Sequence, residues 1–489
     1  MPAASAAPER RTLVTALPLL LLATFAIAGG AAAANLAGQP KLIAAALALA
    51  LGVVTLVMVA RRLGLVVMWV GLALVSIMAG EMSSVSLGGQ NGHLLYTDLV
   101  IGIGAVIACA RNGLMIEVPR APMLDRLWPL LGWCALTLIV ASDPLTAVAE
   151  LKEWMVAGVL GVGAVTAASD ARRARLLLAA VALTGVMIAA GMIGVALTSP
   201  MGAPLAIMRK LVDLPWGRTN YLAGLLIVAI PVLLGLVGDA ASRRGRFVCA
   251  LGLVITMAGL AVSASKGAIV ALAVGLLLTF GLSRRQTLAP RLIVLVVFGL
   301  ATAMFVAGPL HQVIEMRLQT SALDYSAGER MDLYRLAWQQ FLTHPVLGIG
   351  LNDFSVVSHR LHGLDTVPHN LEFGFLAELG LPGLLLVLAW VWAMGDGARR
   401  ALRAAVTPRE RSLALGLVAA FIAFAVHNQV ESTLYGQQYK MILIVQAAAA
   451  WSIARAWEMR NAGAGAAPEC QETLSSSRLR TRFSSGQTG

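Results

Sequence analysis

Residues 221–238 indicate the fold class, because they form an apolar run without a charged side chain: Tyr221-Leu-Ala-Gly-Leu-Leu-Ile-Val-Ala-Ile-Pro-Val-Leu-Leu-Gly-Leu-Val-Gly238. A transmembrane helix needs about 20 predominantly apolar residues. This stretch therefore predicts a helix that crosses a bilayer between about residues 220 and 238.

The whole chain has the same apolar character. Of its 489 residues, 58% are hydrophobic and 13% are charged, and the mean hydropathy is +0.79. Soluble domains carry about 25% charged residues, and disordered chains combine low hydrophobicity with high net charge. Both classes are excluded. The net charge of +12 is therefore interpreted as a topology signal, and no nucleic-acid partner is expected.

Similar apolar segments predict an all-α polytopic membrane protein with about 14 transmembrane helices and one large external loop that contains helices. The first segment follows Arg10 and Arg11 without a clear cleavage context, so we interpret it as a retained helix. The predicted spans are roughly 13–29, 41–60, 63–80, 95–110, 124–142, 154–169, 175–198, 220–238, 247–264, 267–283, 291–308, 371–394, 412–428 and 440–455.

The distribution of basic residues predicts the orientation of these helices. Loops of one parity hold most of the arginines, in clusters such as Arg172-Arg173, Arg243-Arg244 and Arg399-Arg400. The short loops of the other parity hold only Lys41, Lys152, Arg209, Lys210, Arg218 and Lys440. Cytoplasmic loops carry the excess of Lys and Arg. Both termini are therefore expected in the cytoplasm.

This topology divides the chain into five parts. Residues 1–215 hold helices 1–7, 216–308 hold helices 8–11, 309–370 form a periplasmic loop or cap, 371–456 hold helices 12–14, and 457–489 form a disordered cytoplasmic tail. A loop as long as 309–370 is usually functional or disordered. It contains five of the seven histidines: His311, His344, His359, His362 and His369.

A helical pattern across 329–342 indicates that this loop is folded. Met331, Tyr334, Trp338 and Phe341 recur at steps of three and four residues, which places them on one helix face. We therefore expect an external cap, with chemistry where the cap meets the membrane.

Lys266 is the clearest candidate for that chemistry, because charges at membrane depth are costly and often functional. It lies in Ser263-Ala-Ser-Lys-Gly267, at the external end of two apolar runs. It either marks a tight turn by snorkelling to the interface or binds an anion, with Ser263 and Ser265 as hydroxyl donors.

Arg330 and His369 are the other two candidates. Arg330 either pairs with Glu329 or Asp332, or clamps a phosphate with its guanidinium fork. His369 is either a satisfied interfacial residue or a general base with a pKa suited to proton transfer near neutrality. Asn370 follows it and can cap the next helix.

Other polar groups give weaker signals. Glu378, His427, Asn428 and Glu431 lie near the external ends of predicted spans and favour polar contacts within the bundle over catalysis. The four cysteines have no CxxC spacing, and no His, Asp or Glu cluster has metal-ligand spacing. We therefore expect no metal and no cofactor.

Five motifs occur in order in the second half of the chain. They are Gly217-Arg-Thr-Asn-Tyr-Leu-Ala223, Ser263-Ala-Ser-Lys-Gly-Ala268, Gly328-Glu-Arg330 with Trp338, His344-Pro-Val-Leu-Gly-Ile-Gly350, and Pro368-His-Asn370 before Glu378-Leu-Gly-Leu-Pro-Gly383. Over about residues 215–455 the chain resembles the O-antigen ligase and Wzy polymerase superfamily of bacterial envelope enzymes.

The resemblance implies a GT-C-like helical fold and a metal-independent, inverting glycosyltransferase. Such an enzyme moves a glycan from undecaprenyl pyrophosphate to lipid A–core or to another lipid-linked glycan at the periplasmic face. It implies catalytic roles for Lys266, Arg330 and His369. Substrate-binding candidates are Arg218, Asn220, Ser263, Ser265, Asn370 and Glu378. The family usually has Arg at the position of Lys266, and Lys keeps the charge but not the bidentate fork.

Two alternatives stay open at this point. A Wzy-type polymerase differs from a ligase in its acceptor, and both share these motifs. A transporter or lipid-linked glycan flippase also has many helices, but transporters often show inverted repeats and midplane sites. The chain shows no internal repeat, and its candidate residues gather at one face, which favours the enzyme.

Overall fold

A computed structural model describes residues 120–198, 219–263, 265–281, 322–362 and 367–482, together with short stretches between 69 and 105. These residues are almost entirely helical. The sole strand pairing in them is a two-residue antiparallel contact between β1 (Val85–Ser86) and β2 (His93–Leu94).

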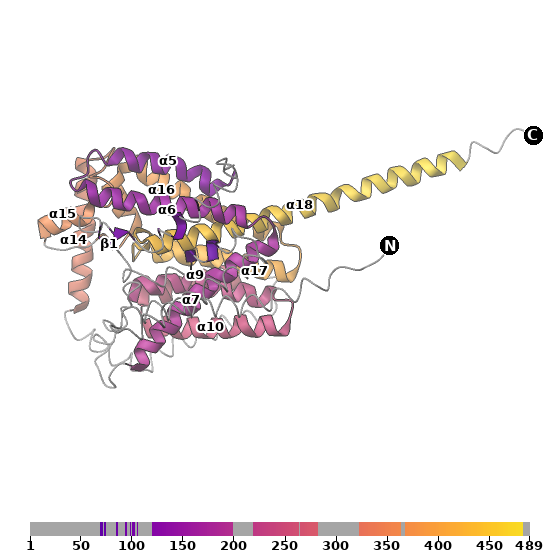
Figure 1. The fold of residues 1–489 in the computed structure, drawn as a ribbon, viewed down its shortest axis with the longest axis horizontal. Helices are drawn as coiled ribbons and strands as arrows, with labels where there is room; N and C mark the ends of the chain where they lie inside the picture. Colours follow the sequence, from indigo (N-terminus) through magenta and orange to yellow (C-terminus); the bar gives the residue numbers. More distant parts are fainter. Residues whose placement is uncertain are drawn as a thin grey trace, which may run out of the picture.

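The long helices run between two ends of a bundle (Figure 1). They are α5 (Pro122–Thr137), α6 (Pro144–Ala167), α7 (Ala171–Thr198), α9 (Thr219–Asp239), α10 (Arg243–Ser263), α11 (Lys266–Leu276), α16 (Leu371–Ala404), α17 (Pro408–His427) and α18 (Gln437–Arg482). A π-helical turn, Leu277–Gly281, continues α11. Connections 168–170, 240–242 and 405–407 lie at one end, called here the arginine end. Connections 138–143 and 428–436 lie at the opposite end.

Five of the described helices are long and apolar enough to cross a membrane: Ala171–Val195 within α7, and α9, α10, α16 and α17. They match the spans predicted at 175–198, 220–238, 247–264, 371–394 and 412–428 within a few residues at most ends. The predicted spans 13–29, 41–60 and 291–308 lie outside the described residues, as do most of 63–80 and 95–110. The count of fourteen therefore stays a prediction.

Helix α9 is the most enclosed of these spans, with α7, α10, α11 and α17 packed around it. Glycine allows the closest approach. A Cβ on Gly416 of α17 would lie 2.4 Å from the carbonyl oxygen of Pro231 and 2.9 Å from Gly235 Cα. Small residues let membrane helices pack backbone to backbone, since lipid provides no hydrophobic drive between helices.

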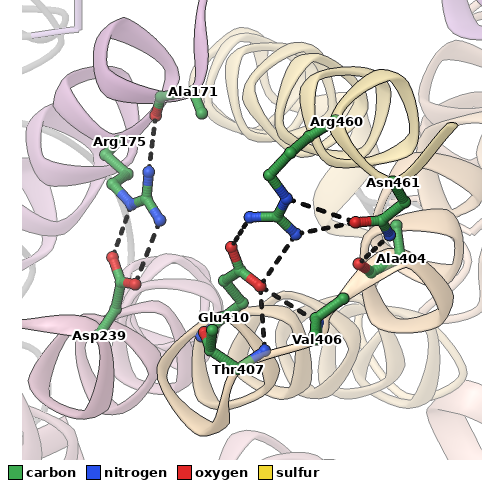
Figure 2. Close-up of polar contacts among 9 residues, drawn as sticks. All are labelled: Ala171, Arg175, Asp239, Ala404, Val406, Thr407, Glu410, Arg460 and Asn461. Atoms are coloured by element: carbon green, nitrogen blue, oxygen red, sulfur yellow. Dashed lines mark hydrogen bonds and ion pairs between the residues drawn. The ribbon is translucent and has the colours of Figure 1, made fainter. Parts of the chain in front are cut away.

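Ion pairs join the helices at the arginine end (Figure 2). Arg175 of α7 donates to Asp239 of α9 from Nε at 2.6 Å and Nη2 at 3.2 Å. Arg460 of α18 pairs with Glu410 of α17, whose carboxylate also accepts from the backbone N–H of Thr407 in a capping box. Some basic residues at this end therefore hold helices together in addition to marking orientation.

Two cations assigned to loops of the other parity are in fact paired within helices. Lys440 of α18 is fully buried and pairs with Glu150 and Glu153 of α6, while Lys152 lies 2.7 Å from Asp98. The prediction that Lys440 and Lys152 are loop charges was wrong. Their carboxylate partners come from distant sequence positions.

Helix α16 breaks at Gly380, where φ is +66°. The indole N–H of Trp133 donates to the carbonyl oxygen of Leu379 at 2.9 Å, and so satisfies a group that the break exposes. The segment 344–353 supplies three further backbone bonds: Ile349 N to Ala377 O, Gly350 N to Glu378 O and Leu381 N to Pro345 O. The glycine-containing stretch after His344 is thus a structural clamp on the kink.

From the geometry of the kink we expect that adding one methyl group at Gly380 lowers the stability of the protein. Gly380→Ala should destabilise the protein, because left-handed backbone at a non-glycine residue costs about 1–3 kcal/mol and the new Cβ would lie 2.1 Å from the Val346 carbonyl oxygen. Thermal unfolding of the purified protein measures it. Gly132→Ala on α5 is the control. Its Cβ meets nothing within 4 Å, so it should stabilise the helix by up to about 1 kcal/mol.

Residues 309–370 are partly helical, as expected. Helix α14 (Ala322–Thr343) includes the helix predicted at 329–342, and α15 (Phe354–His362) follows the clamp. At the other end of the chain, the backbone of α18 is helical through Arg482, whereas the sequence predicted a disordered tail from 457. Ala, Arg and Glu make up 11 of the 26 residues of 457–482, and these residue types favour helix.

Candidate functional site

The connection between α17 and α18, residues 428–436, organises the candidate site. Its backbone holds the start of α16, because the Leu371 N–H donates to the carbonyl oxygen of Asn428 at 3.0 Å. The hydroxyl of Ser432 donates to the carbonyl oxygen of Pro368. The side chain of Asn428 is buried and accepts from the N–H of Thr433 at 3.1 Å, which fixes the connection itself. His369 is thus held between Pro368 and Leu371, which are both bonded to the connection.

Glu431 lies at the centre of this connection and contacts two of the predicted site residues. Its Oε1 is 3.3 Å from His369 Nδ1, and its Oε2 accepts from Asn220 Nδ2 at 3.2 Å. The Glu431 side chain is 20% exposed and that of His369 is 30% exposed. One carboxylate therefore brings the start of α9 and the start of α16 together.

Helix α14 adds Arg330 and Tyr334 to the same place. The Tyr334 hydroxyl donates to the carbonyl oxygen of His369 at 3.2 Å, and its ring stacks on Phe373 with centroids 5.2 Å apart. Arg330, one turn earlier, is half-buried and close enough to Glu431 to act on its charge. In Figure 1, α14 crosses the ends of the bundle helices.

The charge of Glu431 follows from these neighbours. Burial raises the pKa of Glu431, but the hydrogen bond with His369 and the nearby His369, His427 and Arg330 lower it by more. The net pKa lies below its ordinary value, about 4.3, so Glu431 is a carboxylate at neutral pH. Because the folded-state pKa is lowered, the resulting stabilisation is present above the ordinary pKa and is lost as the pH falls through the lowered one.

Lys266 begins α11 beside the same connection. A Cβ on the next residue, Gly267, would lie 2.8 Å from Val430 Cγ2 and 4.0 Å from His427 Cδ2. The absent side chain at 267 therefore lets the start of α11 approach the residue that precedes Glu431. This places the Lys266 backbone at the rim of the site, and its predicted contact with an anion stays a prediction.

The two serines and Asn370 make local contacts. The Ser263 hydroxyl donates to the carbonyl oxygen of Leu260 at 2.5 Å and accepts from the N–H of Ser265 at 3.2 Å. Both serines are buried. Asn370 caps α16 by accepting from the N–H of Phe373 at 3.0 Å, as expected of its position. The proposed substrate contacts of all three stay predictions.

Glu378 lies deeper than the other candidates and is fully buried. It accepts from the Tyr435 hydroxyl at 3.0 Å and from the N–H of Phe354 at 3.3 Å. Its carboxylate thus joins α15, α16 and the 428–436 connection. Arg218 lies outside the described residues. No group of three or more His, Cys, Asp and Glu side chains with metal-site geometry occurs in the part of the chain that the structure describes.

The sequence predicted that Glu431 is a polar contact within the bundle, and its contacts with His369 and Asn220 are of that kind. The sequence did not identify these two partners. These three residues are separated by 62 to 211 positions, so no local spacing links them. One signal in the sequence did relate Glu431 to His369, because both were predicted at the external ends of spans.

The fold and this cluster define a helical membrane protein with a polar site at one end of its bundle. Residues 251–388 match the family described as O-antigen ligase. This match confirms the resemblance to the O-antigen ligase and Wzy polymerase superfamily, whose members process glycans in membranes. The matched segment includes Lys266, Arg330 and His369, and ends before Glu431. No curated protein matches the chain.

Proposed function

We propose that the protein transfers an oligo- or polysaccharide from undecaprenyl pyrophosphate to a sugar hydroxyl at the periplasmic face of a bacterial inner membrane. The observation that carries the proposal is the Glu431 carboxylate between His369 and Asn220, with Arg330 alongside. A base held in one orientation beside cations suits a reaction in which a hydroxyl loses a proton while an anion departs.

In this scheme Glu431 sets the orientation and tautomer of His369. The Nδ1 atom faces the carboxylate, so Nδ1–H donates to Glu431 and Nε2 keeps its lone pair. The acceptor hydroxyl gives its proton to Nε2 while its oxygen forms a bond with the anomeric carbon. Glu431 is then a positioning residue, and His369 the general base.

The leaving group needs stabilisation at the same moment. The bond from the anomeric carbon to the phosphate oxygen breaks, and its electron pair leaves with the pyrophosphate. Fixed positive charges stabilise such developing charge in a partly dehydrated site, and Arg330 and Lys266 take this role without a metal. Attack in one step inverts the anomeric centre.

Glu431→Gln tests the positioning role. The change removes a charge-assisted hydrogen bond, worth about 1.5–3 kcal/mol, so kcat should fall on the order of 10–100-fold with KM nearly unchanged. Steady-state kinetics of the purified enzyme give both constants. Asp332→Asn is the control, since Asp332 is exposed and pairs with Arg335. Unchanged kcat in the Gln variant would show that the carboxylate does not orient the base.

Labelling of single cysteines tests the face of the membrane. With native cysteines replaced, Gln339→Cys on α14 should react with an impermeant thiol reagent in whole cells. Arg403→Cys near the arginine end should react only after lysis, because loops rich in Arg stay in the cytoplasm. The opposite pattern would place the site on the cytoplasmic side and remove the proposed donor.

Deletion of the gene tests the function and separates the alternatives. Undecorated lipid A–core with long free polymer would identify a ligase, and single-repeat products a polymerase. A third outcome is transport of lipid-linked glycan across reconstituted vesicles by the purified protein, without glycan transfer. That result would instead identify a flippase.

A further inference from the structure

Helix α14 has an apolar stripe that the protein does not cover. Met331, Trp338 and Leu342 are each about half exposed, with Trp338 at 46% and Leu342 at 60%. Their spacing of seven and four residues places them along one line of the helix. The buried face of α14 is a different one, formed by Leu333, Leu336 and Ala337. The face predicted from Met331, Tyr334, Trp338 and Phe341 exists, but the protein covers it only in part.

This stripe continues onto a membrane-spanning helix. After α14 ends at Thr343, Val346 is 58% exposed, and Leu381 of α16 is 48% exposed. The two are neighbours, because the N–H of Leu381 donates to the carbonyl oxygen of Pro345 at 2.9 Å. From there the exposed residues on α16 are Leu385, Leu388 and Trp392, at steps of three and four. That is the pattern of a lipid-facing side of a span.

The length of α16 indicates the depth of this junction. The part of α16 after the kink, residues 381–404, has 24 residues and extends about 36 Å at 1.5 Å per residue, whereas the hydrocarbon core is about 30 Å thick. Polar residues Asp396 and Arg399 mark one boundary. The kink at Gly380, where the clamp and the end of α14 pack, lies 16 residues before Asp396 and 19 before Arg399, which is about 24–29 Å along the helix. The C-terminal end of α14 is therefore level with the opposite boundary of the hydrocarbon.

We propose that α14 is an interfacial helix whose Trp338–Leu342 stripe lies on the phospholipid surface of the bilayer that α16 spans. The helix crosses the ends of the bundle helices (Figure 1), and this direction suits a helix in the membrane plane. Trp is enriched at membrane–water interfaces, and an amphipathic helix in the interface buries its apolar face while its polar face stays in water. Here Asp332, Arg335 and Gln339 form the exposed polar side.

The proposal gives the site a fixed height above the membrane. Tyr334 and Arg330 lie on the same helix as the stripe, and Tyr334 contacts His369. A helix held by lipid along one side would keep these residues level with the head group of a lipid-linked substrate. The inference rests on the membrane assignment and on contacts of α14, so it does not require the proposed chemistry.

Fluorescent probes in lipid nanodiscs test the lipid contact. Single cysteines replace Trp338, Leu342 or Val346 in the full-length protein without its native cysteines, and each carries an environment-sensitive dye. Dyes at these positions should emit at shorter wavelength and lose most of their emission to phospholipids with a quencher near the carbonyl groups. Gln339→Cys is the matched control, one residue from Trp338 on the polar side. Its dye should instead be quenched by aqueous iodide.

Two outcomes would overturn the proposal. Quenching of the stripe dyes by iodide and not by lipid would show a stripe in water. Resistance to both quenchers would show that another protein surface covers it. Because three positions report independently, failure of one variant to fold leaves the test intact. Transfer activity of the same samples separates this result from the proposed function.

Discussion

His369→Ala should lower the turnover of glycan transfer by about 10²–10⁴-fold, the usual contribution of general acid–base catalysis. His369 Nδ1 lies 3.3 Å from a carboxylate oxygen of Glu431, and the His369 side chain is 30% exposed. The measurement uses purified enzyme in detergent with an undecaprenyl-pyrophosphate glycan and an acceptor. A chelator is present throughout, because the proposed scheme uses no metal.

His359→Ala is the matched control for that experiment. His359 is exposed on α15 within the same predicted loop, and its removal should change turnover little. We expect the same of His362→Ala. Near-normal turnover of His369→Ala would remove the base from the mechanism and leave electrostatic stabilisation alone. Wild-type enzyme that is active without chelator and inactive with it would contradict the metal-free scheme.

Hydropathy predicted the described spans well where the helices face lipid or an apolar neighbour. It was less accurate for α6, which begins at Pro144 and not near 154. Glu150, Lys152 and Glu153 caused that error, because a segment with three charges looks too polar to enter a bundle. In the structure each is neutralised by a partner far along the chain, such as Lys440 for Glu150. Tertiary pairing of this kind has no local sequence signature.

Local sequence patterns also identified only part of the candidate site. Lys266 and His369 could be identified because each adjoins an apolar run, and the family motifs point to the same positions. Arg330 was placed at the start of a helix from 329, whereas α14 begins at Ala322, so the helix dipole has little effect on it. The role of Glu431 depends on contacts between α9, α16 and the 428–436 connection. Only the folded arrangement brings those three segments together.

Lys266→Ala and Arg330→Ala should each remove most of the transfer activity while the protein still inserts and purifies normally. Removal of one fixed group that stabilises developing charge typically costs about 10²–10³ in kcat. Arg330 is half-buried near Glu431, and Lys266 lies beside Val430 at the rim of the site. Both positions lie near the 428–436 connection, whose Glu431 contacts the proposed base.

Two further variants distinguish charge from structure. Lys266→Arg should retain activity, because it keeps the cation and provides the fork that phosphate recognition favours. Arg335→Ala should be nearly neutral, since Arg335 is exposed on α14 and pairs only with Asp332 among the contacts described. Turnover of all four variants is compared at equal amounts of purified protein. Full activity of Lys266→Ala would show that the Ser263-Ala-Ser-Lys266 motif does not bind the leaving group, and the pyrophosphate would then depend on Arg330 and its neighbours alone.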